Sequence, residues 1–245
     1  DAKILSGAIE NAQKSVESRN FQTRKNVLQY DDVMNTQREV IYKQRRQVLD
    51  GEDVHAAIEN MLTNIVTSLV SGHAGEQGKL DREGFRLATG HLAGALFSQA
   101  QLQELEGQVD TLSADELTQR MLELARENYD RREQEINTMM APLFRDGKSP
   151  MRELERVILL RVVDEYWMDH IDAMTELRQG IGLRAYGQSD PVVEYKREGF
   201  DMFEQMIAAI QEETLRRLFT VRLKTNEEIR RERVAKVTGE SGGSD

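Results

Sequence analysis

The sequence predicts an all-α protein, on three observations. Only three prolines occur in 245 residues, and the first of them is Pro142, so a long stretch contains nothing that forbids a helical hydrogen bond. Apolar residues recur in steps of three, four or seven, which is the spacing of one face of a helix. Glycines and short polar stretches interrupt this pattern at a few places and divide the chain into its expected elements.

Composition narrows the class of protein. With 39% hydrophobic and 31% charged residues, the chain has the balance of a soluble, folded protein. It has no cysteine, which excludes disulfides, thiolate metal sites and cysteine catalysis, and fits a reducing compartment. No apolar run approaches the roughly 18 to 20 residues of a membrane span, and the first residues form a charged amphipathic pattern rather than a signal peptide. The net charge of −10 argues against binding nucleic acid.

Residues 1–50 are expected to form one long helix. A single glycine, Gly7, lies between Ile4 and Leu49, and the apolar positions keep helical spacing throughout. At about 1.5 Å per residue such a helix spans on the order of 65 to 70 Å, which is longer than a small domain is wide. It is therefore expected to run as a spine beside other material.

Residues 51–147 are expected to form a separate acidic helical subdomain. This segment has 17 acidic against 8 basic residues. Asp53 is placed to cap a helix that ends near Val70, and Ser113 with Glu116 forms the Ser-x-x-Glu signature of a capping box before a further long helix.

Residues 148–224 are expected to form an antiparallel helical hairpin. Two apolar stripes, one through Trp167 and one through Phe203, flank a loop over residues 180–190. Asp190 and Pro191 have the residue types of an N-cap and a first helical position. Residues 225–245 are expected to prolong the charged helix end and then to form a flexible linker.

The motifs of nucleotide binding fail when their spacing is tested. A phosphate-binding loop needs a glycine five residues before the glycine of its Gly-Lys pair, but His73 and Pro142 stand there before the pairs at 78–79 and 147–149. The Gly-x-Gly-x-x-Ala pattern at 180–185 follows a helix, whereas the dinucleotide motif follows a strand. We therefore expect no cofactor in this chain.

One compact group of acidic and imidazole side chains is a candidate metal or acid–base site. Metal sites draw ligands from more than one segment or from a histidine pair, and the four histidines of the chain give no such pair. We expect no metal and no catalytic residue, and interpret the group as a solvated acidic face; its members are Asp164, Glu165, Asp169, His170 and Asp172.

The hairpin loop is the most informative candidate site. It takes eleven residues, where connections between helices usually take two to eight. Tyr186 offers a large ring with a hydroxyl group, which suits contact with varied polypeptide. The neighbouring candidates are Ile181, Leu183 and the positively charged Arg178 and Arg184. In the alternative interpretation, Leu183 and Tyr186 fold back and plug the end of the hairpin.

Two stretches, residues 17–42 (ESRNFQTRKNVLQYDDVMNTQREVIY) and 168–203 (MDHIDAMTELRQGIGLRAYGQSDPVVEYKREGFDMF), resemble the C-terminal third of the SecA family, the bacterial preprotein translocase motors. The resemblance implies that residues 1–50 are the long helix of a helical scaffold. It implies likewise that residues 51–147 are the helical wing and that residues 148–224 are the two-helix finger.

The resemblance also implies a function. In that family the finger loop enters the SecYEG channel and pushes the preprotein, so Tyr186, Arg184, Leu183 and Ile181 become the expected preprotein or channel contacts. The hairpin also restrains the ATPase, and Trp167 is expected to serve mainly in packing, with regulation as its consequence. The nucleotide-binding motor domains are absent from this chain, so it is not expected to be an enzyme by itself, and ATP is implied only for those domains.

The resemblance places the full-length protein in the cytoplasm, peripheral to the inner face of the bacterial plasma membrane. Self-association through an uncovered apolar stripe of the long helix is a further expectation. An alternative needs no family knowledge: a non-catalytic helical scaffold or adaptor that binds partner proteins through its wing and hairpin.

Overall fold

The structure is a computed structural model that describes residues 2–51, 53–75, 80–90, 93–144, 149–184 and 190–222. Within these ranges all regular elements are helices, which confirms the predicted all-α class. None of these helices is both long enough and apolar enough to cross a membrane.

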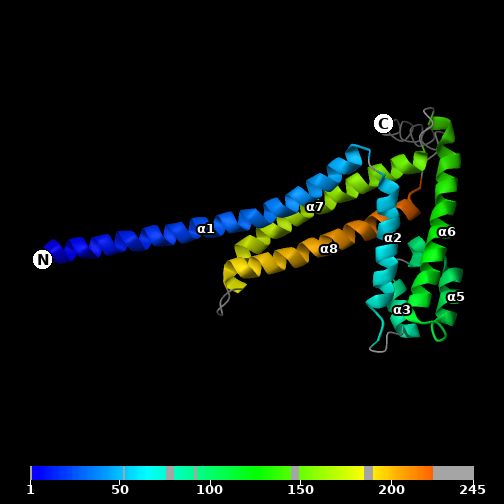
Figure 1. The fold of residues 1–245 in the computed structure, drawn as a ribbon, viewed down its shortest axis with the longest axis horizontal. Coiled ribbons are helices and arrows are strands. Elements are labelled where there is room, and N and C mark those ends of the chain that lie inside the picture. Colours follow the sequence, from blue (N-terminus) through cyan, green and yellow to red (C-terminus); the bar gives the residue numbers. More distant parts are fainter. Residues whose placement is uncertain are drawn as a thin grey trace, which may run out of the picture.

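Helix α1 (Ala2–Leu49) is one continuous rod, as predicted. Its C-terminal half lies along the hairpin formed by α7 and α8, whereas its N-terminal half projects beyond that hairpin (Figure 1). Every side chain described between residues 9 and 25 is exposed to solvent. At about 1.5 Å per residue, this uncovered part is roughly 25 Å long.

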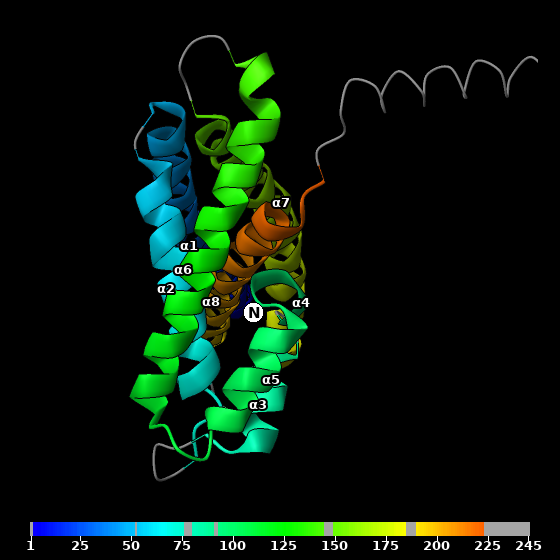
Figure 2. The same ribbon diagram turned by 90° about the vertical axis from the view of Figure 1, so that its right-hand side faces the viewer.

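The helices described between residues 51 and 147, called the wing below after the resemblance, stand across the end of this rod (Figures 1 and 2). Its long helices α2 (Val54–Ser71) and α6 (Ala114–Met140) pack side by side. The short helices α3 (Arg82–Thr89) and α5 (Gln99–Gln108) pack together at the far end of the wing, whereas α4 (Ala93–Leu96) packs against α8 (Pro191–Thr220) of the hairpin (Figure 2). Asp53 accepts a hydrogen bond from the His55 backbone, and Ser113 with Glu116 closes a capping box, as their sequence signatures predict.

The hairpin consists of α7 (Pro150–Arg184) and α8 (Pro191–Thr220), and the Asp190 side chain caps α8 by accepting from the Val192 backbone. The prediction of a loop that begins at residue 180 is wrong by about one turn, because α7 continues to Arg184. The glycine at position 180 is tolerated inside the helix, where its cost of roughly 1 kcal/mol is offset by packing of the next turn.

The main apolar core joins the wing to the base of the hairpin. One cluster of buried side chains includes Ile58 and Leu62 of α2, Met121 of α6, Ile158 of α7 and Leu215 of α8. The predicted boundary near residue 148 therefore falls between two helices, but the helices on its two sides share one apolar core. A second, smaller cluster lies between the hairpin and α1, nearer the hairpin's free end.

Candidate functional site

The free end of the hairpin is the candidate site, and the structure describes only some of its residues. Tyr186 lies outside the described residues, as does the rest of the connection at 185–189. Leu183 and Arg184 belong to the last turn of α7, but their side chains lie outside the described part. The interpretation in which Leu183 and Tyr186 plug the hairpin concerns these same residues.

Ile181 does not lie on the surface. Its side chain is 2% exposed and belongs to the smaller cluster, together with Met174, Leu177 and Tyr195. Side chains from α1 complete the packing, so this end of the hairpin is held against the scaffold helix. Ile181 therefore packs against other helices, although it was expected to contact a partner at the surface. The face of α7 that packs against α1 extends to this residue.

Aromatic packing and one ion pair tie the same end of the hairpin to α1. The rings of Tyr30 and Tyr195 meet edge to face with centroids 4.7 Å apart. Arg178 lies over the Tyr30 ring at 5.9 Å and places a guanidinium nitrogen 3.2 Å from an Asp31 carboxylate oxygen. Burial, followed by the nearby charge of Asp190, raises the pKa of Tyr30. Arg178, one of the positively charged candidates near the loop, therefore has its charge paired with a carboxylate of α1.

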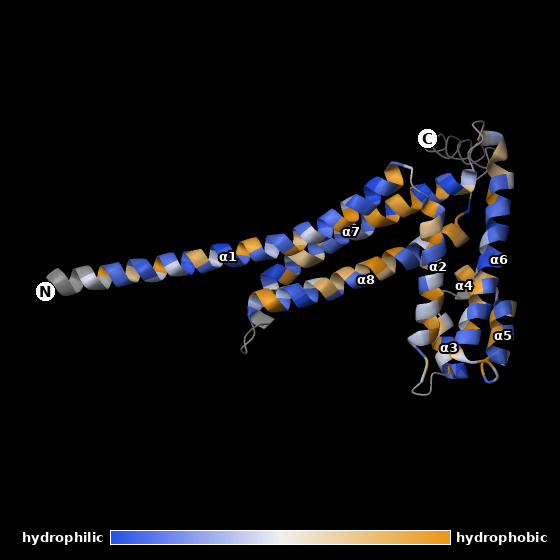
Figure 3. Cartoon of the chain, viewed as in Figure 1, coloured by the Kyte–Doolittle hydropathy of each residue, from blue (hydrophilic) through white to orange (hydrophobic). Residues whose placement is uncertain are grey.

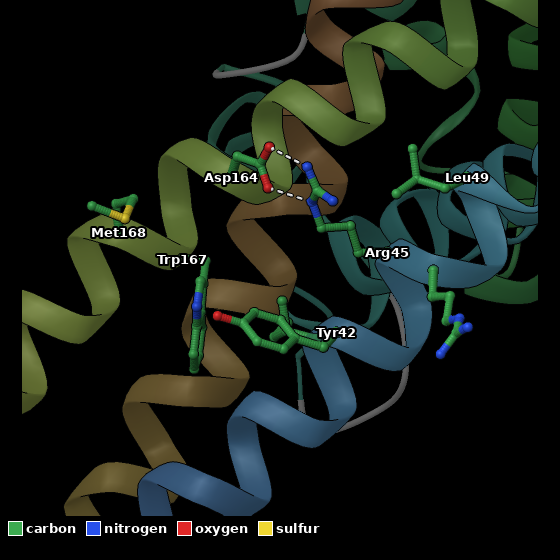
Figure 4. Close-up of a pocket in the computed structure, with 8 residues that line it drawn as sticks. Tyr42, Arg45, Leu49, Asp164, Trp167 and Met168 are labelled. Atoms are coloured by element: carbon green, nitrogen blue, oxygen red, sulfur yellow. Dashed lines mark hydrogen bonds and ion pairs between the residues drawn. The ribbon is translucent and has the colours of Figure 1, made fainter.

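Trp167 lies midway along α7, at the floor of a cleft of about 380 Å³ between α1 and α7 (Figure 4). It is 5% exposed, and its indole nitrogen has no hydrogen-bond partner among the described residues. Tyr42 faces it from α1, and Arg45 closes one side of the cleft by donating to Asp164 at 2.8 Å. Tyr42 and Met168 leave about half or more of their surface exposed.

The acidic group around residue 165 is exposed at Asp164, Asp169 and Asp172, as a solvated face predicts, and two of its members form ion pairs. Asp164 binds Arg45, and Glu165 accepts hydrogen bonds from Arg217 at 2.6 Å and from Arg161 at 3.0 Å. These bonds, that from Arg217 first, lower the pKa of Glu165. The interpretation as a solvated face is wrong for His170, which is buried. No group of three or more potential metal ligands occurs within the described ranges.

The sequence analysis missed a buried ionic cluster where the wing meets the hairpin. Glu155 of α7 has no exposed surface, and one of its carboxylate oxygens contacts Tyr129 of α6, Arg152 of α7 and His55 of α2. Arg152 also binds Glu133 of α6 at 2.5 Å. Burial, and then the hydrogen bond to Glu155, raises the pKa of Tyr129 far above its ordinary value. The sequence did contain a signal for this cluster, because Glu155 stands among apolar positions of the same helix face.

Comparison with known proteins agrees with this architecture. The family model described as "SecA Wing and Scaffold domain" matches residues 1–222. The chain belongs to the SecA family. It is 46% identical to the protein translocase subunit SecA of Clostridium perfringens, over all of this chain and 28% of that relative. It is also 44% identical to the protein translocase subunit SecA 1 of Clostridioides difficile, over 99% of this chain and 25% of that relative.

The SecA family match confirms the resemblance read from residues 17–42 and 168–203. The chain spans only about a quarter of the length of the curated relatives it matches. The family description names a scaffold and a wing, and the structure shows a long helix with a helical region across its end (Figure 1).

Proposed function

We propose that this chain is the mechanical arm of a protein-translocating ATPase of the SecA family. In this proposal, movement of motor domains is relayed through α1 and the hairpin to the hairpin's free end, which contacts preprotein at the SecYEG channel. The chain itself hydrolyses no ATP; ATP belongs to motor domains elsewhere in the longer protein. That protein acts at the cytoplasmic face of the bacterial membrane.

One observation carries the proposal: α7 and α8 project together from the wing, and the C-terminal end of α7 and the N-terminal end of α8 both lie at the end of the hairpin remote from the wing (Figure 1). In the sequence, residues 185–189 form the connection between these two ends. An α-helical pair transmits displacement well because each helix is internally hydrogen-bonded and the two share a packed seam. Tyr186 stands in this connection, where an aromatic ring with a hydroxyl group suits contact with many polypeptide sequences. Arg184 and Leu183 flank it as further proposed contacts.

The projecting half of α1 provides the input in this proposal. It is a mostly hydrophilic rod with single hydrophobic residues along it (Figure 3). Several of these are large and exposed: Ile9, Val16, Phe21 and Leu28. We assign this stripe to contact with the motor domains, and expect self-association through it when they are missing. Regulation of the ATPase follows if the Trp167 packing changes as those domains move.

Site-specific photocrosslinking in the full-length protein tests the output. A photoreactive amino acid at Tyr186 should capture a translocating preprotein, and Tyr186→Ala should uncouple ATP hydrolysis from transport. The matched control places the same group at Phe200, which is 57% exposed on the side of α8. Equal capture at both positions, or normal transport by Tyr186→Ala, would favour the adaptor alternative, in which the hairpin only binds partner proteins.

A further inference from the structure

A buried polar contact joins α1, α7 and α8 at a single level. Gln37 of α1 is 7% exposed and His170 of α7 is 4% exposed. The Gln37 side-chain nitrogen donates to the backbone carbonyl of Gly199 at 2.9 Å, and its side-chain oxygen lies 2.9 Å from Nε2 of His170. All three groups come from different helices, so the contact depends on how these helices are placed along one another.

The roles of donor and acceptor in this contact are fixed. A carbonyl oxygen can only accept, so the end of Gln37 that faces Gly199 is its NH2 group. The oxygen of Gln37 then faces His170, and Nε2 of His170 must carry the proton that it donates. Burial lowers the pKa of His170, which favours the neutral ring that this arrangement requires.

On α7 and α8 the polar contact lies between buried members of the two apolar clusters, whereas on α1 Met34 packs against both clusters. On α7, His170 lies between Trp167 of the main cluster and Met174 of the smaller one. On α8, Gly199 lies between Tyr195 and Met206, which also belong to different clusters. The Met174 side chain packs directly against Gly199, since a Cβ atom on Gly199 would lie 2.7 Å from the end of that side chain.

The apolar packing on either side does not define the register of the helices by itself. Hydrophobic contact is non-directional, and methionine side chains adapt to several packings. Four methionines of α1, α7 and α8 belong to the two clusters or pack against them: Met34, Met174, Met202 and Met206. A slide of one helical turn, about 5.4 Å, would preserve much of the apolar contact but would leave the buried amide, imidazole and carbonyl groups unpaired.

We propose that Gln37, His170 and the Gly199 carbonyl form a register key, which holds the hairpin at one position along α1. A single buried polar contact plays this part in some coiled coils, where it costs stability but fixes alignment. The proposal rests on the proposed function for its consequence: with the key in place, movement of α1 reaches the hairpin's free end and is not lost as sliding. These are positioning residues that touch no substrate.

Distance measurements between spin labels test the key directly, and the cysteine-free sequence makes labelling specific. The distal pair is Leu28→Cys with Val193→Cys, and the base pair is Leu49→Cys with Val157→Cys; all four positions are exposed. In the variant with both Gln37→Met and His170→Leu, the distal distances should broaden or shift by up to about 5 Å, while the base distances stay as in the unchanged chain. Unchanged distal distances would overturn the key.

Two further variants separate the key from general loss of packing. Met174→Leu changes apolar packing one turn away and should leave both distance distributions unaltered. His170→Gln keeps an uncharged donor toward Gln37 and should retain the narrow distal distribution. If His170→Gln broadens the distal distances as much as the apolar double variant does, hydrogen bonding does not set the register and the key is wrong.

Thermal unfolding gives an independent check. Gln37→Met or His170→Leu alone leaves a buried partner unpaired and should lower the unfolding midpoint by roughly 3–8 °C. The double variant should recover most of that loss, and losses that simply add would contradict a coupled pair. In the full-length protein the double variant should lose transport per ATP hydrolysed. If the distances change but transport does not, the key stands and the proposed function fails.

Discussion

The base and the free end of the hairpin are held in different ways. At the base, side chains of α2, α6, α7 and α8 share one continuous core and enclose the Glu155 cluster. Near the free end, four buried residues of the hairpin pack against α1 alone, and the accompanying Arg178–Asp31 pair is about half exposed. The wing and the base of the hairpin therefore form one packed unit. The far end of the hairpin is held by its contact with α1, which we call the seam.

The charged contacts at the base and at the free end of the hairpin also differ in how deeply they are buried. Glu155 is completely buried, so loss of a partner leaves a charge in a medium of low dielectric constant. Solvent-exposed ion pairs such as Arg178–Asp31 are screened and contribute little to stability. The base is thus held by a buried charge that is costly to leave unpaired, whereas the ion pair at the free end is cheap to break and remake.

The largest expected effect comes from removing Arg152, the cation that pairs with the buried Glu155. Arg152→Met leaves the Glu155 carboxylate buried without its cation and should lower the free energy of unfolding by about 3–5 kcal/mol. Urea denaturation measures this loss. Arg126→Met is the matched control in the adjoining wing helix α6, because Arg126 binds Glu59 at 3.2 Å on the surface and its loss should cost about 0–1 kcal/mol. Equal losses would show that the Glu155 cluster is not special.

A smaller and more local effect is expected at the far end of the seam. Ile181→Ala creates a cavity beside Tyr195 and should cost about 2–4 kcal/mol. If base and seam open separately, hydrogen exchange should accelerate in residues 174–184 and 190–199 but not in α2 or α6. Val157→Ala, at an exposed position of the same helix, should change exchange little. Uniform acceleration throughout the chain would show one cooperative unit.

The sequence predicted the helices well because helical periodicity and capping are local properties. Asp53, Ser113 and Asp190 each cap the helix that their residue types predict. The sequence analysis ended α7 too early because it took Gly180 as the start of a loop. A glycine ends a helix only where tertiary contacts do not hold the following residues in the helix. Ile181 does pack, against helices distant in the chain, so tertiary contact overrode the local preference.

The side-chain site was less predictable because its partners are remote in sequence. Asp31 and Arg178 are separated by 147 residues, and Gln37 and His170 by 133. A stripe on one helix does not show which residue of another helix lies opposite it. Residue type alone was misleading for His170, which was assigned to a solvated acidic face although it is buried against Gln37 of α1. It also did not show that the Arg178 charge is paired with Asp31 of α1. Glu155 was missed for the same reason.

The smallest expected effect is a pH dependence at the level of the register key. Burial lowers the pKa of His170 in the folded state, so between that value and the ordinary value near 6.5 the unfolded chain binds the extra proton. Stability should therefore be complete above about pH 7, decline as the pH falls through 6.5, and level off once the folded state is protonated too.

Urea midpoints measured between pH 5 and 7.5 would show this slope, and His170→Gln should remove it while keeping a neutral donor to Gln37. Glu213 adds a loss only at lower pH: burial opposes its ionisation, but hydrogen bonds from Arg216 and Arg217 hold its pKa below the ordinary value. Spin-label distances in the same pH range decide where the loss occurs. A change at the distal pair without one at the base pair would place the titration in the seam, whereas an equal slope in His170→Gln would remove His170 as its source.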